Sequence, residues 1–160
     1  MTYKITAPQR LEATINLPAS KSVSNRALII NAQAGAPVLP QNLSDCDDTQ
    51  VVINALKTNP PVIDIHAAGT AMRFMTAYLA VTEGEHVLTG TPRMRQRPIA
   101  QLVNALVKLG ADIAYEGEEG FPPLRIKGKR LPGGRVEMPA DVSSQYISAL
   151  LMVATTMENE

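Results

Sequence analysis

The chain contains few of the residues on which several classes of protein depend. It has no tryptophan, four tyrosines, two phenylalanines and a single cysteine, Cys46. One cysteine excludes a disulfide framework within the chain and offers no metal cluster, so we predict neither a metal site nor a cofactor. Its 15 basic residues are balanced by 15 acidic residues, which argues against binding of nucleic acid or of an anionic membrane. Any basic residues that bind a ligand must therefore do so through local contacts and not through the overall charge of the protein.

Long hydrophobic runs are also missing. Residues 1–17 alternate and carry charges throughout, so they lack the apolar core of a secretory signal. The longest apolar run, residues 149–154, is far too short to span a bilayer. We therefore predict a soluble, cytoplasmic protein. Apolar residues make up 45% of the 160 residues, which is enough for a core, and the length favours one domain, or one domain and a fragment.

The alternation of strand-like and helix-like segments predicts an α/β (α+β) fold built from repeated βαβαββ units. Strands are expected at residues 3–7, 11–17, 38–43, 62–65, 85–89, 111–115, 124–127 and 135–138. Helices are expected at residues 21–34, 44–57, 71–82 and 99–109, and from residue 143 towards the C-terminus. The last unit stops after one helix, which leaves a hydrophobic face without its partner.

Residues 18–26, with the sequence PASKSVSNR, join a predicted strand to a predicted helix. The unpaired N–H groups and the positive dipole end of a helix both point at such a turn and suit it to an anion. The turn also carries hydroxyl groups and two cations, Lys21 and Arg26. We predict that it binds a phosphorylated, carboxylate-bearing small molecule. The alternative is that the serines cap the helix and the cations are solvated.

Three later segments carry related chemistry. Residues 67–73, AAGTAMR, place Gly69 where backbone N–H groups can approach a ligand closely and Thr70 where it can cap or bind. Residues 88–98, LTGTPRMRQRP, hold three arginines at alternate positions, which repel one another unless an anion holds them together; a solvated loop, or a loop that touches RNA, is the alternative. Residues 141–146, DVSSQY, open the last helix with two serines that are caps by default.

Three acidic residues lie at the start of the second predicted helix: Asp45, Asp47 and Asp48. We interpret them as residues that stabilise the helix dipole rather than as metal ligands.

In their order and spacing, the four segments resemble the N-terminal portion of EPSP synthase, the enolpyruvyl transferase of the shikimate pathway. Residues 18–26 match the family signature Pro-x-Ser-Lys-Ser-x-Ser-x-Arg, and residues 93–98 match Arg-Met-x-x-Arg-Pro. Residues 67–73 resemble Asn-Ala-Gly-Thr-Ala-x-Arg, and residues 142–146 resemble Val-Ser-Ser-Gln-aromatic. Two residues depart from the family pattern. Ala67 stands where the family commonly has asparagine, and Phe74 stands where it commonly has proline.

The resemblance implies a transferase that moves the enolpyruvyl group of phosphoenolpyruvate to the 5-hydroxyl of shikimate-3-phosphate and releases phosphate, a step of aromatic amino acid biosynthesis. It implies that Gly69 and Arg97 contact phosphoenolpyruvate and that Lys21 touches both substrates. Gln145 holds shikimate-3-phosphate and also reaches phosphoenolpyruvate, and Thr70 belongs to the same substrate-binding set. Further contacts to shikimate-3-phosphate are implied for Ser22, Arg26, Ser143 and Ser144.

The resemblance also implies a division of the chain. Residues 1–17 are expected to form strands that pack with a second domain, and residues 18–160 to form an incomplete N-terminal substrate-binding domain. The family's catalytic aspartate and glutamate come from its later half, so no catalytic residue is assigned and the chain is expected to be inactive alone. We expect the full-length form to be a monomer and this chain to self-associate. The alternatives are a non-catalytic anion- or RNA-binding module of the same architecture and a relative of UDP-N-acetylglucosamine enolpyruvyl transferase.

Overall fold

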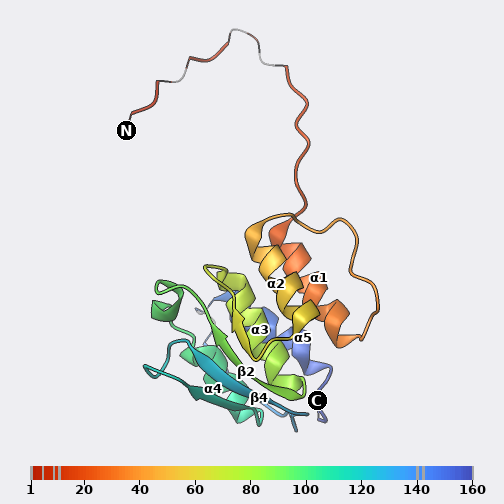
Figure 1. Ribbon diagram of the computed structural model, residues 1–160, viewed down its shortest axis with the longest axis vertical. Coiled ribbons are helices and arrows are strands. Elements are labelled where there is room, and N and C mark those ends of the chain that lie inside the picture. Colours follow the sequence, from red (N-terminus) through yellow and green to blue (C-terminus); the bar gives the residue numbers. More distant parts are fainter. Residues whose placement is uncertain are drawn as a thin grey trace.

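The computed structural model describes residues 2–4, 6–8, 10, 12–139, 141 and 143–159. A four-stranded mixed sheet lies along one side of the molecule, and helices cover its inner face (Figure 1). The strands alternate accordingly. In β4 (Leu124–Gly128), Leu124 and Ile126 are fully buried, whereas the next side chains along the strand, Arg125 and Lys127, are exposed. One face of the sheet is therefore core and the other is solvated, as period-two alternation requires.

One complete βαβαββ unit runs from residue 62 to residue 128, which confirms the predicted order there. Its elements are β1 (Val62–Asp64), α3 (Gly69–Val81), β2 (Gly84–Thr89), α4 (Ala100–Lys108), β3 (Asp112–Tyr115) and β4, with a short 3-10 helix, η1 (Met94–Gln96), before α4. The strand order is β1-β2-β4-β3, with β1 parallel to β2 and the other two pairs antiparallel. Because β1 and β2 are parallel, the loops that follow them meet at the same edge of the sheet.

The central element of the core is α3. Every residue of this helix except Tyr78 and Val81 is buried, including the polar Thr76 and the charged Arg73. A helix that is hydrophobic all round must be surrounded, and α3 packs against α1, α2, α4, α5 and the sheet. Its position explains why the first turn of α3 can be reached from several distant parts of the chain.

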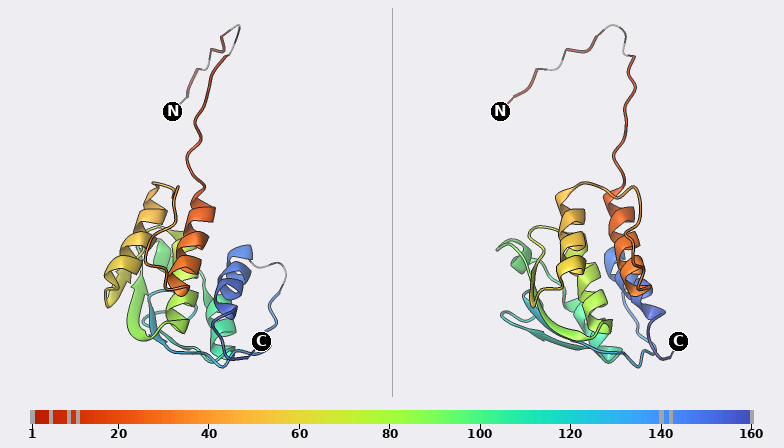
Figure 2. Two further views of the ribbon diagram at one scale, coloured as in Figure 1. Left: turned by 90° about the vertical axis from the view of Figure 1, so that its right-hand side faces the viewer. Right: turned by 45° about the vertical axis from the view of Figure 1, so that its right-hand side comes forward.

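Three more helices complete the structure: α1 (Lys21–Gln33), α2 (Asp47–Thr58) and α5 (Ser144–Ala154). The N-termini of α1, α2, α3 and α5 lie towards the same end of the molecule (Figures 1 and 2). Two of them are capped by serine hydroxyls: Ser20 Oγ accepts from Val23 N at 3.4 Å, and Ser143 Oγ accepts from Gln145 N at 3.3 Å. The α2 helix begins later than predicted, with Cys46 rather than Ser44 and Asp45 at its N-cap.

Four of the predicted strands are not observed. Residues 38–43 contain Pro40, which has no N–H to donate, and Asn42, whose φ of 54° is incompatible with a strand. Residues 135–138 are also irregular, and only Gly133 nearby forms an isolated parallel bridge, to Asn159.

In the N-terminal stretch, the described residues 2–4, 6–8 and 12–17 form no strand, and the rest of residues 1–17 lies partly outside the described set. The chain leaves the body of the molecule ahead of α1 (Figure 1). Alternation alone does not make a strand, because a strand also requires a neighbouring segment to complete its backbone hydrogen bonds.

None of the helices in the described part of the chain combines the length and the apolar character that a membrane crossing requires.

Candidate anion-binding site

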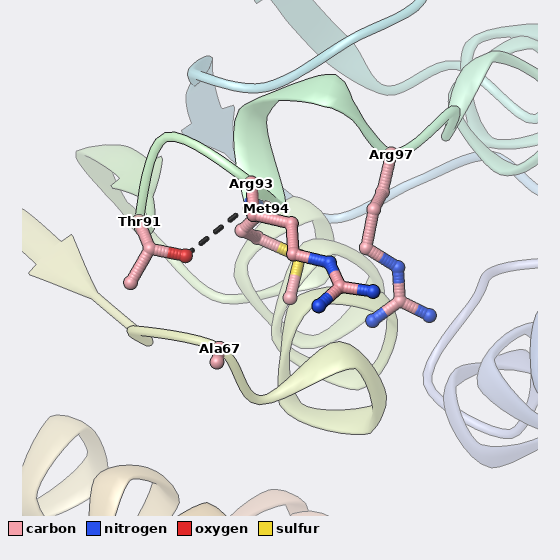
Figure 3. A pocket seen from close by; sticks show the side chains of 5 residues that line it. All are labelled: Ala67, Thr91, Arg93, Met94 and Arg97. Carbon is pink, nitrogen blue, oxygen red and sulfur yellow. Dashed lines mark hydrogen bonds between the residues drawn. The ribbon is translucent and has the colours of Figure 1, made fainter.

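A pocket of about 420 Å³ lies between the segment that follows β1 and the loop that follows β2 (Figure 3). Its lining residues are Ala67, Thr91, Arg93, Met94 and Arg97. Two backbone hydrogen bonds hold the two segments together below the pocket: Ile65 N donates to Thr89 O at 3.0 Å and Thr91 N to His66 O at 3.1 Å. The parallel pairing of β1 and β2 thus continues into the loops and places the pocket at their shared edge.

Gly90 permits this close approach of the two loops. A Cβ atom at this position would lie 2.5 Å from His66 O and 2.8 Å from Met94 Cγ, so any larger residue would push the loops apart. Met94 itself is buried and anchors the arginine-bearing loop to the core. The position of the arginines therefore depends on a glycine that carries no ligand-binding group.

Two guanidinium groups meet at the first turn of α3. A Cβ atom on Gly69 would overlap Arg97 Nη1 and would lie 3.0 Å from Arg73 Nη1. Arg73 is only 7% exposed and donates from Nη1 to Gly69 O at 2.6 Å, while its buried Nε has no partner among the described residues. Since α3 also directs its positive dipole end here, this corner of the molecule favours negative charge.

The start of α5 completes this corner. Gln145 Nε2 donates to Thr70 Oγ1 at 3.1 Å, which joins the first turns of α5 and α3. Tyr146 donates its hydroxyl proton to Pro98 O at 2.8 Å, and its ring centre lies 5.5 Å from Arg73 Cζ. Ser143 is the N-cap of α5, whereas the hydroxyl of Ser144 has no hydrogen-bond partner among the described residues.

Residues at the start of α1 reach the same region less directly. Lys21 Nζ forms an ion pair with Asp48 Oδ2 at 3.0 Å. Asp48 lines a second pocket, of about 390 Å³, whose wall includes Ala67 and so adjoins the first pocket. The negative charge of Asp48 lowers the field that Lys21 would otherwise present to an anion.

Arg26 is held by three neighbouring groups. Its Nη1 donates to Ser22 O at 3.0 Å, its Nη2 donates to Ser148 Oγ at 3.3 Å, and its Cζ lies 5.2 Å from the ring centre of Phe74. The contact with Ser148 ties α1 to α5, and the contact with Phe74 ties α1 to α3. Arg26 is therefore fixed between the same helices that carry Gly69 and Gln145.

The structure thus brings Gly69, Thr70, Arg97 and Gln145 into one cluster. Arg26 is tied to the helices of this cluster through Ser148 and Phe74 and contacts the backbone of Ser22, whereas Lys21 pairs with Asp48 in the adjoining pocket. The sequence predicted no ligand contact for Arg73, treated Arg93 only as one of three arginines on its loop, and treated Asp48 only as a capping residue of the second helix. Arg73 could have been found from helical spacing, because a side chain at i+4 points back over the residue at i, which here is Gly69. The directions of Arg93 and Asp48 depend on tertiary contacts and have no comparable signal.

The first turn of α2 carries Asp47 and Asp48, which favours the predicted dipole capping. Burial tends to raise the pKa of the neighbouring Cys46 thiol, but hydrogen bonds with Ser44 and Thr49 outweigh it and lower that pKa below its ordinary value. Among the described residues, no group of three or more His, Cys, Asp or Glu side chains could hold a metal ion.

Comparisons with known proteins agree on one family. The family model described as EPSP synthase (3-phosphoshikimate 1-carboxyvinyltransferase) matches residues 5–59 and 53–160. A 3-phosphoshikimate 1-carboxyvinyltransferase from Bacteroides fragilis strain ATCC 25285 is 60% identical over 159 residues, which cover 99% of this chain and 39% of the relative. The enzyme of that name from Haemophilus influenzae strain PittEE is 42% identical over 179 residues, covering 94% of this chain and 41% of the relative. This chain therefore spans about two fifths of the length of these relatives.

A solved structure has the same fold. EPSP synthase from Acinetobacter baumannii superposes with a TM-score of 0.76 at 22% identity, over 90% of this chain and 38% of that one. Because the identity is low, this likeness shows a shared fold only. The mixed α/β arrangement seen here forms part of that larger protein.

Proposed function

This chain belongs to the EPSP synthase family, and on that premise we propose that it forms part of an enzyme that joins phosphoenolpyruvate to shikimate-3-phosphate. The reaction transfers the enolpyruvyl group to the 5-hydroxyl of shikimate-3-phosphate and releases phosphate. The observation that supports the proposal best is the cluster at the first turn of α3, where Gly69, Arg97 and Gln145 meet although they are distant in the sequence. Such a cluster of positive charge and hydrogen-bond donors suits ligands that carry phosphate and carboxylate groups.

We assign the phosphoenolpyruvate side of the site to the α3 corner. Gly69 allows a ligand to approach the backbone N–H groups of the first turn, and Arg97 supplies a guanidinium group beside it. Gln145, in the first turn of α5, donates to Thr70 and so lies at this corner. Positive charge in this position would stabilise the negative charge of the phosphate as it leaves.

We assign the shikimate-3-phosphate side to the N-termini of α1 and α5. Its contacts come from Ser22, Arg26, Ser143 and Ser144, with Lys21 and Gln145 shared between the two substrates. The Lys21 ammonium keeps two N–H donors beyond its ion pair with Asp48, and the negative charge of Asp48 weakens the attraction of Lys21 for a phosphate. Because Arg26 stacks on Phe74, its guanidinium group is already held in place before a substrate binds.

The proton transfers of the reaction need acid and base groups, and none of the substrate contacts proposed above is a carboxylate or an imidazole. The chain spans 39% of its Bacteroides relative. We therefore propose that the 160-residue chain binds substrates without turning them over. We further propose that residues 1–17 pair with a second domain of the longer relatives, that residues 18–160 form part of the N-terminal substrate-binding domain, and that the protein acts in the cytoplasm.

Calorimetry on the purified chain tests the proposed function. Shikimate-3-phosphate should bind, and Arg26→Gln should weaken that binding at least several-fold, because one charge-assisted contact is lost. A short single-stranded RNA at the same ionic strength should not bind. Binding of RNA alone would favour the non-catalytic module, and robust turnover of both substrates by the chain would contradict the proposed inactivity.

A further inference from the structure

We propose that Arg93 is a second anion-binding residue of the pocket, and that it contacts one anionic group of a ligand whose other anionic group is held by Arg97 and the first turn of α3. The inference rests on the proposed function of the pocket. It adds a residue to which that proposal gives no role, and it makes the pocket selective for doubly anionic ligands over single anions.

The side chains of Arg93 and Arg97 point in the same direction (Figure 3). Arg93 and Arg97 both line the pocket, and in Figure 3 both leave the loop on the same side and point towards the segment that carries Ala67. The two residues flank η1 as its N-cap and C-cap, so one turn of chain separates them. Arg95, midway between them, instead donates from Nε to Gly90 O at 3.0 Å and lines no part of this pocket.

Positive charge accumulates at this pocket. No ion pair among the described residues involves Arg93 or Arg97, and Arg73 adds a third guanidinium at Gly69. Like charges gathered at one place repel, and the loop that carries two of them is held by backbone hydrogen bonds to a buried core. An anion with two charged groups would bind to both arginines and remove this repulsion.

The wall of the pocket opposite the arginines is formed by Ala67 (Figure 3). Ala67 offers only a methyl group where the family commonly has asparagine, so no polar side chain from this wall can satisfy a ligand there. Besides Arg97, the loop side of the pocket carries Arg93 and the Thr91 hydroxyl, which accepts from Met94 N at 3.3 Å and can donate its own proton. A carboxylate or phosphate that extends from Arg97 along this wall would therefore meet Arg93.

Calorimetric titration of the 160-residue chain with phosphoenolpyruvate and with inorganic phosphate tests the inference. Arg93→Gln should weaken phosphoenolpyruvate binding about tenfold and leave phosphate binding within about twofold, since a hydrogen bond to a charged group is worth that much. Arg97→Gln should weaken both ligands. Arg95→Gln is the matched control, because it removes the same charge from the same loop and should change neither ligand by more than about twofold. Arg93→Lys keeps the charge and should give an intermediate loss for phosphoenolpyruvate.

The outcomes separate this inference from the proposed function. If Arg93→Gln behaves like Arg95→Gln, or weakens both ligands equally, Arg93 contributes only to the general field and the inference is wrong. If Arg97→Gln also leaves phosphoenolpyruvate binding unchanged, the proposed function of the pocket fails as well.

Discussion

Gly69 is the residue of the site against which two arginine side chains lie. The space that a Cβ atom would occupy is taken by the guanidinium of Arg97, with Arg73 Nη1 3.0 Å away. Both obstacles are the ends of flexible side chains rather than backbone, so a methyl group would displace them without unfolding α3. The consequence of a substitution should therefore appear in ligand binding and not in folding.

We expect Gly69→Ala to fold and to bind phosphoenolpyruvate about tenfold more weakly, because Arg97 loses its position beside the first turn of α3. Calorimetry measures the affinity, and thermal unfolding checks the fold. Gly117→Ala is the control, since a Cβ there would meet nothing within 4 Å. Unchanged affinity in Gly69→Ala would show that Arg97 does not act through this contact.

Tyr115 links a single residue to the pH dependence of stability. Burial, and then the nearby negative charge of Glu119, raise the pKa of its hydroxyl above the ordinary value. The unfolded chain therefore loses this proton more readily than the folded chain. The folded protein keeps its full stability below the pKa that Tyr115 has in the unfolded chain, and it loses part of that stability as the pH rises above about 10. The hydroxyl oxygen also has no hydrogen-bond partner among the described residues.

We expect Tyr115→Phe to be as stable as the parent chain near pH 8, or more stable by up to about 1 kcal/mol, because an unsatisfied hydroxyl is removed. Above about pH 10 the variant should lose less stability than the parent. Urea unfolding at both pH values measures the difference. A parallel decline in the two proteins would mean that Tyr115 does not ionise on unfolding.

At the scale of elements, the N-terminus of α5 matters most, because it touches both α3 and the arginine loop. Two adjacent serines open this helix, and only Ser143 caps it: its hydroxyl accepts from Gln145 N, the residue that also binds Thr70. Loss of the cap would loosen the turn that places Gln145.

We expect Ser143→Ala to lower the free energy of unfolding by about 1 kcal/mol, the usual cost of removing a serine N-cap. Ser144→Ala is the matched control and should change stability by less than half of that, since its hydroxyl has no partner among the described residues. Denaturant titration provides the comparison. Equal losses in the two variants would contradict the capping role.

At the scale of the whole molecule, an apolar surface runs along α1 and α5. Ile30 is 53% exposed and Leu151 is 67% exposed, and both line a groove of about 560 Å³ between the two helices. Val23 and Ile147 on the same helices are also exposed. Apolar side chains gathered in this way favour association, so the predicted self-association remains a prediction with a defined surface.

We expect sedimentation velocity to show concentration-dependent association of the 160-residue chain, and Leu151→Lys to shift the population towards monomer. Asn104→Lys, which adds the same charge at an exposed site on α4, should not. A strictly monomeric parent chain at high concentration would contradict the prediction.

The helices were predictable from the sequence and several strands were not. The apolar stripe of α4 and the continuous hydrophobic character of α3 are local patterns, and the observed helices fall within three residues of the predicted bounds at their starts. Residues 38–43 and 135–138 also look like strands locally, but a strand exists only where a second segment supplies its hydrogen bonds. The same limit applies to the described part of residues 1–17.

The chemical groups available to the site can be read from the amino-acid sequence: a glycine and a threonine at the start of α3, a glutamine at the start of α5 and three arginines on one loop. Their residue types and their places at helix starts are local properties of the chain. Which of these groups meet depends on how the chain folds. The tertiary structure turned Arg93 and Arg97 into the pocket and Arg95 towards Gly90, and it joined Gln145 to Thr70, because side-chain direction is set by contacts between segments far apart in sequence.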